Sequence, residues 1–160
     1  MASIITPPAA FLSVPAVVAN ASVTGTLVET ELGTVTIPAS AYQPLSFIQF
    51  FFGVRTAAPA IAAIVLRTRF ASIAGTSLSS FNLAIAGRGA RGWNWLYVAT
   101  ATAVRVYSAS NLIGSAATTA IADQVIAAGA PIAITLSAQL GDVGDVVTLD
   151  YLQTSQSKVL

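Results

Sequence analysis

Along most of the chain, apolar and polar residues alternate with a period of two. The clearest stretch is Ile132–Leu140, where Ile, Ile, Leu, Ala and Leu occupy every second position and Ala, Thr, Ser and Gln fill the others. Successive side chains of a β-strand point to opposite sides, so this alternation predicts a strand with one buried face. No stretch shows the 3.6-residue stripe of an amphipathic helix with a charged opposite side. The pattern therefore predicts an all-β protein.

Turn residues separate the predicted strands. Gly-Asp-Val-Gly-Asp at 141–145 is a turn signal, and alternation resumes at 147–152, so we interpret 132–140 and 147–152 as a closing hairpin. The alanine-rich segment 117–128 is the one place where a helix is the alternative. The remaining predicted strands, which bring the total to about eight, are 34–37, 46–54, 61–70, 80–86, 94–107 and 125–127.

The length and the strand count together predict the architecture. A chain of 160 residues favours one domain. About eight short antiparallel strands in that length fit a β-sandwich, and we expect a jelly-roll-like arrangement. Residues 1–21 contain three prolines and are predicted to form an extended N-terminal arm, lying on a neighbour or on the domain's own edge. Residues 22–160 then form the single β-sandwich domain, with 155–160 as a short tail.

The composition is unusually poor in charge. Charged residues make up 8% of the chain, against about 25% in an ordinary soluble domain. Seven basic and six acidic side chains exclude a protein that coats nucleic acid. A surface with so few charges is predicted to associate, so we expect much of it to be covered by other subunits.

The mean hydropathy of +0.77 raises the question of a membrane span. The longest uncharged stretches are 1–28 and 32–54, and both are interrupted by prolines and polar residues. Neither is the unbroken apolar run of about 20 residues that a spanning helix needs. The N-terminus has no positively charged segment of the kind that opens a secretory signal. We therefore expect a protein made in the cytoplasm, with no membrane partner.

The chain contains neither histidine nor cysteine. This excludes catalysis by imidazole or thiolate and the usual zinc sites. Among the six carboxylates, Glu29 and Glu31 are predicted to share one face of a solvated strand edge. Asp142 and Asp145 lie in a predicted turn, where Asp caps backbone N–H groups, with a calcium site as the alternative. We predict no catalytic residue, no cofactor and no metal site.

Residues 87–92, Gly-Arg-Gly-Ala-Arg-Gly, match the dinucleotide-binding pattern G-x-G-x-x-G. That motif requires a helix after it, whereas Trp-Asn-Trp-Leu-Tyr-Val follows here and is typical of a strand. The interpretation is a glycine-rich loop between strands. Its Arg88 and Arg91 are expected to pair with acids such as Asp142 or Asp145, or to contact a neighbouring subunit.

Aromatic side chains supply the other candidates for binding. Trp93 and Trp95 are two residues apart and are predicted to share one sheet face, in the core or at a subunit interface. A sugar-binding platform and stacking on nucleic acid are the alternatives. Arg67 and Arg69 also share a face, which we expect to be solvated or to contact another subunit. The residues predicted to be interface candidates are Phe47, Phe50, Phe51, Phe52, Trp93, Trp95, Arg88 and Arg91.

Several segments resemble structural proteins of tailed-phage virions. They are Thr26–Ala39, which contains Glu-Thr-Glu-Leu and ends in Ile-Pro-Ala, Arg67-Thr-Arg69-Phe, Ile132–Leu140 and Gly144–Tyr151. The resemblance covers about residues 24–153. It departs from the family between 43 and 59, where an apolar stretch replaces the usual glycine- and asparagine-rich loop.

The resemblance implies a jelly-roll decoration or cement protein, or a fibre-associated one. Such a protein assembles as a trimer, binds a major capsid protein at the capsid surface and reinforces the shell mechanically. The apolar replacement at 43–59 suggests a larger buried contact than in the family. The alternatives are a tail-fibre or receptor-binding module, a small single-jelly-roll shell subunit, and a non-viral assembly or secreted β module.

Overall fold

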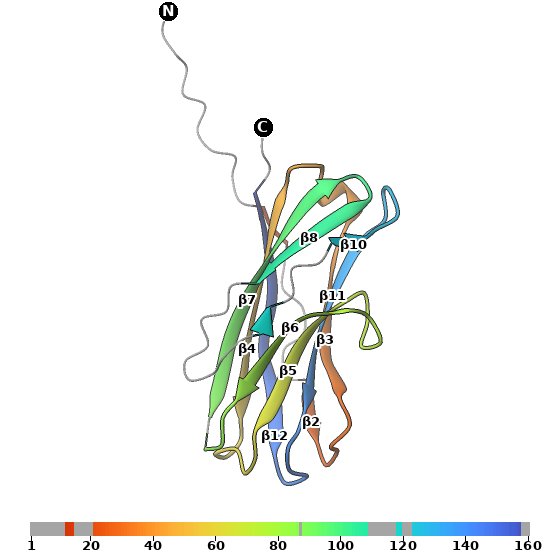
Figure 1. Cartoon of the computed structure of the whole chain (residues 1–160). Helices are drawn as coiled ribbons and strands as arrows, with labels where there is room; N and C mark the ends of the chain where they lie inside the picture. Colours follow the sequence, from red (N-terminus) through yellow and green to blue (C-terminus); the bar gives the residue numbers. More distant parts are fainter. Residues whose placement is uncertain (1–11, 15–20, 87, 109–117, 120–122, 158–160) are drawn as a thin grey trace, which may run out of the picture.

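The computed structural model describes residues 12–14, 21–86, 88–108, 118–119 and 123–157. Within these ranges the chain forms twelve β-strands and one short 3-10 helix, η1 (Ala39–Ala41). The strands form two antiparallel sheets that pack face to face in an elongated sandwich (Figure 1). The predicted all-β, antiparallel sandwich is confirmed.

The two sheets, named here A and B, share the strands unequally. Sheet A has the order β1 (Leu12–Val14), β12 (Val146–Ser157), β4 (Phe47–Thr56), β7 (Gly89–Thr100), β8 (Ala103–Ser108) and β10 (Asp123–Val125), and β2 (Ser22–Thr24) also pairs with β12. Sheet B has the order β3 (Thr30–Ile37), β11 (Ile132–Gln139), β5 (Ile64–Phe70), β6 (Ser77–Leu83) and β9 (Thr118–Thr119).

Eight of these strands form a jelly roll. The order β2-β12-β4-β7 in sheet A faces β3-β11-β5-β6 in sheet B, so the chain passes repeatedly from one sheet to the other. This is the double Greek-key arrangement of two four-stranded sheets. Seven of the eight predicted strands fall on strands of this frame, and the eighth, 125–127, overlaps the end of β10 outside it. The sequence pattern did not predict β1, β2 and β9, and it did not separate β8 from β7. β1, β9 and β10 lie at sheet edges, whereas β8 lies between β7 and β10.

The core lies between the sheets and follows the period-two pattern. In β11, Ile132, Ile134 and Leu136 are wholly buried, as are Phe50 and Phe52 in β4. The ring of Phe52 contacts that of Phe81 across the sandwich, with centroids 5.2 Å apart. Phe50 and Phe52 therefore belong to the core, and they are removed from the candidates for a surface interface.

The predicted closing hairpin is wrong. β11 pairs with β3 and β5 in sheet B, whereas β12 pairs with β1, β2 and β4 in sheet A. The turn at 141–145 carries the chain from one sheet to the other. Gly and Asp mark a reversal of the chain in both cases, so the turn residues do not reveal whether the next strand joins the same sheet.

Some predicted strand boundaries also need correction. The segment 94–107 is two strands, β7 and β8, joined by a tight turn at 101–102, and the predicted strand 80–86 is β6, which begins at Ser77 and ends at Leu83. The helical alternative for 117–128 is not found where that segment is described, because β9 and β10 are strands.

The two ends of the chain differ from the expectation in part. Leu12–Val14 pairs with Thr154–Gln156 of β12, so this piece of the predicted arm lies on the domain's own edge. The rest of the arm, 1–11 and 15–20, lies outside the described residues. The predicted tail is wrong as far as Ser157, since β12 continues to that residue and pairs with β4.

Candidate functional site

A set of aromatic side chains covers part of the outer side of sheet A. It comes from the neighbouring strands β4 and β7, where Phe47 pairs with Tyr97, Gln49 with Trp95 and Phe51 with Trp93. In both strands the residues between them face inward and are buried, which directs these side chains away from the core. We call this set the aromatic face; its members are Phe47, Phe51, Trp93, Trp95 and Tyr97.

The rings of the aromatic face hold one another in place. Phe47 lies between Tyr97, at a centroid distance of 4.9 Å, and Trp95, at 6.4 Å in an edge-to-face arrangement. Trp93 and Trp95 are 6.1 Å apart and nearly perpendicular. Aromatic pairs of this geometry stabilise a protein by about 0.5–1.5 kcal/mol each beyond the burial of their area. The face is thus ordered before any partner binds.

The aromatic face is only partly covered by the described residues. Phe47 is 37% exposed, and Phe51, Trp93, Trp95 and Tyr97 are partly buried. Trp93 and Trp95 share one face, as predicted, and that face is not the core. The structure therefore brings together four of the predicted interface candidates, Phe47, Phe51, Trp93 and Trp95.

Beside the aromatic face, sheet A has an open hollow of about 390 Å³. We call it the glycine hollow; it is lined by Gly53, Val54, Gly89, Ala90, Arg91, Asp150 and Tyr151. Gly53 pairs with Arg91 of β7 and with Tyr151 of β12. The Gly53–Arg91 pair lies two residues along β4 and β7 from the Phe51–Trp93 pair. The aromatic face and the glycine hollow are thus continuous on one side of the molecule.

The ring of Tyr151 lies directly over Gly53. A Cβ atom on Gly53 would overlap this ring, so only glycine allows it to lie against the backbone of β4. The register of β12 and β4 shifts between Leu149 and Tyr151, and Asp150 and Tyr151 are both exposed. Tyr151 keeps 40% of its surface exposed.

Two arginines lie at or beside the glycine hollow, and they differ in whether they form an ion pair. Arg55 forms an ion pair with Asp150. Arg91 lines the hollow, is exposed and has no acidic partner within the described part of the chain. The predicted pairing of Arg88 and Arg91 with Asp142 or Asp145 is wrong.

The two aspartates of the 141–145 turn bind backbone groups instead. Asp142 accepts a hydrogen bond from the N–H of Gly144 at 2.7 Å, as expected for a capping residue. The carboxylate of Asp145 is buried and accepts from the N–H groups of Ile61, at 2.7 Å, and Ala62, at 3.3 Å. It therefore ties this turn to the connection between β4 and β5.

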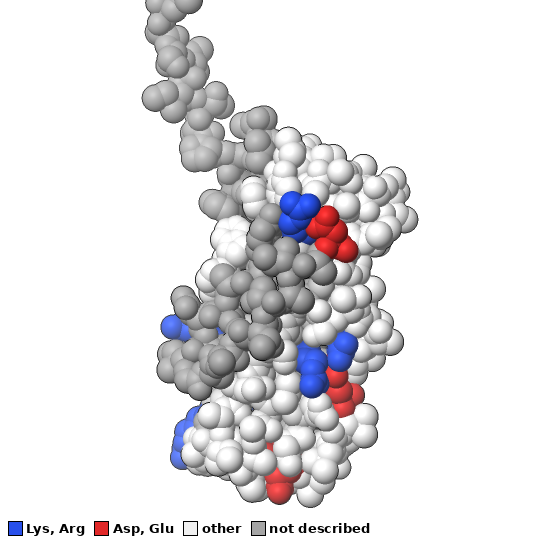
Figure 2. All heavy atoms as spheres, in the orientation of Figure 1, with Lys and Arg blue, Asp and Glu red and all other residues white. Residues whose placement is uncertain are grey.

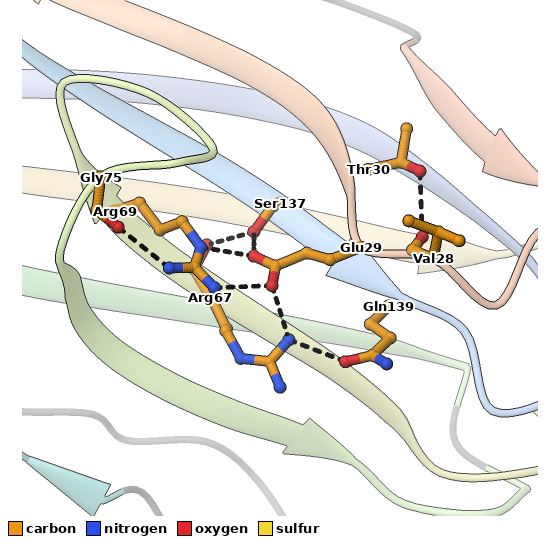
Figure 3. Close-up of polar contacts among 8 residues, drawn as sticks. All are labelled: Val28, Glu29, Thr30, Arg67, Arg69, Gly75, Ser137 and Gln139. Atoms are coloured by element: carbon orange, nitrogen blue, oxygen red, sulfur yellow. Dashed lines mark hydrogen bonds and ion pairs between the residues drawn. The ribbon is translucent and has the colours of Figure 1, made fainter.

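The outer side of sheet B carries a network of polar side chains centred on Glu29 (Figure 3). Arg69 donates to both carboxylate oxygens, from Nε at 2.5 Å and from Nη2 at 2.6 Å, and Arg67 donates from Nη1 at 3.0 Å. Ser137 Oγ donates to Oε1 at 2.5 Å. We call Glu29, Arg67, Arg69 and Ser137 the Glu29 cluster.

The Glu29 cluster is largely shielded from water and strongly favours the ionised carboxylate. The Glu29 side chain is 18% exposed. The hydrogen bonds from Arg69 and from Ser137, with the charges of both arginines, outweigh partial burial and lower the pKa of Glu29 from 4.5 to about 2. The prediction of a solvated edge for Glu29 is wrong, because its side chain is largely covered and pairs within the chain. Arg67 and Arg69 pair with it and stay partly exposed, and contact of their face with another subunit stays a prediction.

A smaller polar group lies between the sheets. Asn94 Nδ2, on the inner side of β7, donates to Thr68 Oγ1 at 2.7 Å and to Ser79 Oγ at 3.0 Å, both in sheet B. All three side chains are buried. The group joins the two sheets and offers no opening to a ligand.

The loop with the G-x-G-x-x-G pattern joins two strands, β6 and β7, and β7 already includes its last four residues, 89–92. The prediction of a strand after the motif is confirmed. Within the described residues no group of three acidic side chains could hold a metal ion, and no helix is long and apolar enough to cross a membrane. Space-filling atoms in Figure 2 show a mostly uncharged surface, on which blue and red side chains lie next to one another in a few places.

Sequence reasoning missed two aromatic residues of this side of sheet A. Tyr97 continues the period-two series of Trp93 and Trp95, so the alternation itself is the signal that could have found it. Tyr151 has no such signal, because its position over Gly53 depends on the pairing of strands almost 100 residues apart.

The fold defines this chain as an antiparallel jelly-roll β-sandwich. No protein-family model matches it, and no curated protein matches it. Among solved structures it is similar to the CBM2 module of the evolved Dit protein of Lactobacillus casei BL23 phage J-1, with 12% identity, over 79% of this chain and 69% of that chain, at a TM-score of 0.36. A likeness at this level carries no argument about function, and the resemblance to tailed-phage proteins stays a prediction.

Proposed function

We propose that this chain is a non-enzymatic structural protein of a virion that binds other protein subunits through its aromatic face. The observation that carries the proposal is the set of ordered, partly exposed rings on the outer side of sheet A. Aromatic residues dominate the energetics of protein interfaces because they bury a large area and lose little conformational entropy. The 8% of charged residues, about a third of the usual share, fits a surface that is covered in an assembly.

The more specific form of the proposal is a capsid decoration or cement protein. The sequence resemblance to tailed-phage structural proteins supports a virion role, and the jelly roll is a common fold of capsid proteins. In this role the chain assembles with copies of itself, as a trimer, and contacts a major capsid protein. Buried area added across subunit junctions would then stabilise the shell against internal pressure.

Variants of the aromatic face test this proposal. We expect Trp93→Ala or Phe51→Ala to weaken self-association by about tenfold or more, measured by sedimentation velocity over a concentration series. Gln49→Arg is a second variant that keeps every ring and places a charge among them, with the same expected result. The matched control is Thr36→Ala on the outer side of sheet B. Folded variants that associate like the parent chain would contradict the proposal.

A second experiment separates the virion roles. Gold-labelled antibody against this chain, applied to phage particles of the source and viewed by electron microscopy, is expected to label the heads. Label at the tail ends would instead favour a receptor-binding module, the second candidate, for which the glycine hollow beside the aromatic face is the specific supporting observation. Absence of label from all particles would contradict both roles.

A further inference from the structure

We propose that the glycine hollow is a binding site for an acidic saccharide, a pyranose ring that carries a carboxylate. The inference rests on the hollow alone and not on the aromatic face. Its volume of about 390 Å³ is within the range of roughly 300–1,000 Å³ that is typical of small-molecule sites. Three features of the hollow favour such a ligand: its floor, its aromatic wall and its charges.

The floor is backbone, because two glycines lie two residues out of register on neighbouring strands, Gly53 opposite Arg91 and Gly89 opposite Arg55. Gly53 and Gly89 belong to β4 and β7, and both line the hollow. A Cβ at Gly89 would come within 2.8 Å of the carbonyl oxygen of Val54, and one at Gly53 would overlap Tyr151. A larger residue at either position would fill the space or force its neighbours apart. The hollow therefore depends on these two glycines.

The aromatic wall is the ring of Tyr151. One side of this ring packs on Gly53, and 40% of the residue is exposed to solvent. A pyranose has apolar C–H groups on one side of its ring, and burying them against an aromatic surface is favourable. The ring is held in place before the ligand arrives, so little conformational entropy is lost on binding.

The polar groups of the hollow favour an anion. Arg91 lines it and has no acidic partner within the described residues, whereas the carboxylate of Asp150 is already paired with Arg55. One unpaired guanidinium therefore faces the ligand. A guanidinium binds a carboxylate through two parallel hydrogen bonds, and such charge-assisted bonds are about twice as strong as neutral ones. Asp150 remains available to accept from a sugar hydroxyl.

The test is a titration of the whole, isotope-labelled chain, followed by NMR of its backbone amides. The probes are methyl β-D-glucuronide, its neutral counterpart methyl β-D-glucoside, and inorganic sulfate at equal ionic strength. We expect the glucuronide to shift the amide signals of Gly53, Gly89 and Arg91 and to bind about tenfold more tightly than the glucoside or sulfate.

Three variants assign the effect to the hollow. Arg91→Ala is expected to reduce the affinity for the glucuronide about tenfold and to remove its advantage over the glucoside. Tyr151→Ala is expected to weaken both sugars by about tenfold. Arg88→Ala removes an equal charge from an exposed residue outside the hollow and is the matched control, with no change expected.

Four outcomes would overturn the proposal. They are equal affinity for the two sugars, equal affinity for sulfate and glucuronide, an equal loss in Arg88→Ala and Arg91→Ala, and no saturable shift at tens of millimolar ligand. The assembly role is tested separately, because Trp93→Ala changes the aromatic face and no residue that lines the hollow, and it is expected to leave the affinity for the glucuronide unchanged.

Discussion

The outer sides of the two sheets belong to one sandwich and follow one alternation, yet their chemistry differs. On sheet B the outward residues are mostly hydroxyl-bearing or charged, and they bond to one another, as in the Glu29 cluster. On sheet A they include six aromatic residues, the aromatic face and Tyr151, and an arginine, Arg91, that has no acidic partner among the described residues. Sheet B thus satisfies its polar groups within the chain, whereas sheet A presents groups suited to an external partner. This contrast favours sheet A as the side of the molecule that binds external partners.

The largest expected effect separates the inner from the outer side of β4. Phe52→Ala removes a wholly buried ring that contacts Phe81, so we expect the free energy of unfolding to fall by about 4 kcal/mol. Phe51→Ala removes a partly exposed ring, and we expect a loss of about 1 kcal/mol. Urea unfolding of both variants measures the difference. Similar losses would show that the aromatic face is part of the core.

The polar outer side of sheet B is tested at Glu29. Glu29→Gln leaves the partly buried Arg67 and Arg69 without a carboxylate, so we expect a loss of about 2 kcal/mol in urea unfolding at neutral pH. Glu31→Gln is the control two residues away: its carboxylate is exposed and, among the described residues, accepts only from Thr34. Equal effects of the two variants would mean that the Glu29 cluster contributes nothing specific.

The Glu29 cluster also predicts that the free energy of unfolding depends on pH. The folded pKa of Glu29 is about 2, below the 4.5 of the free side chain, so its contribution is complete above about pH 4.5 and is lost as the pH falls toward 2. Since the site is partly exposed, we expect this loss to be about 2 kcal/mol. Unfolding measured between pH 5 and 2 in the parent chain and in Glu29→Gln gives the difference. A decline of the same size in the variant would contradict the assignment to Glu29.

A smaller effect tests the packing that shapes the glycine hollow. Gly53→Ala places a Cβ where the Tyr151 ring lies, and we expect a loss of about 1 kcal/mol as the ring is displaced. In the background of Tyr151→Ala the same substitution is expected to cost little, because the overlap is absent. A double-mutant cycle in urea measures this coupling. Additive effects would show that Tyr151 does not rest on Gly53.

The smallest effect concerns the exposed ion pair at the edge of the hollow. Arg55 and Asp150 have side chains that are 56% and 33% exposed. An exposed pair contributes little, so we expect Arg55→Gln to change the free energy of unfolding by less than about 0.5 kcal/mol. Urea unfolding at low and high salt measures it. A loss as large as that of Glu29→Gln would remove the contrast between the outer sides of sheets A and B.

The period-two alternation was enough to predict the class of fold and the direction of most side chains. It placed Trp93 and Trp95 on one face, and the same parity separates Phe51 from Phe50 and Phe52, which the sequence analysis grouped together. The number of alternating segments and the turn residues between them were enough for an antiparallel jelly-roll-like sandwich. These features are local, since each depends on residues a few positions apart.

Which strands pair, and which distant side chains meet, was decided by the tertiary structure alone. The predicted hairpin of β11 and β12 failed because a turn signal does not name the sheet that the next strand joins. Glu29 meets Arg67 and Arg69, and Tyr151 rests on Gly53, through pairings between segments far apart in the chain. Alternation determines the side of a strand on which a residue lies, whereas its neighbours there depend on the register of other strands. The composition of the aromatic face was therefore largely contained in the sequence, and the glycine hollow was not.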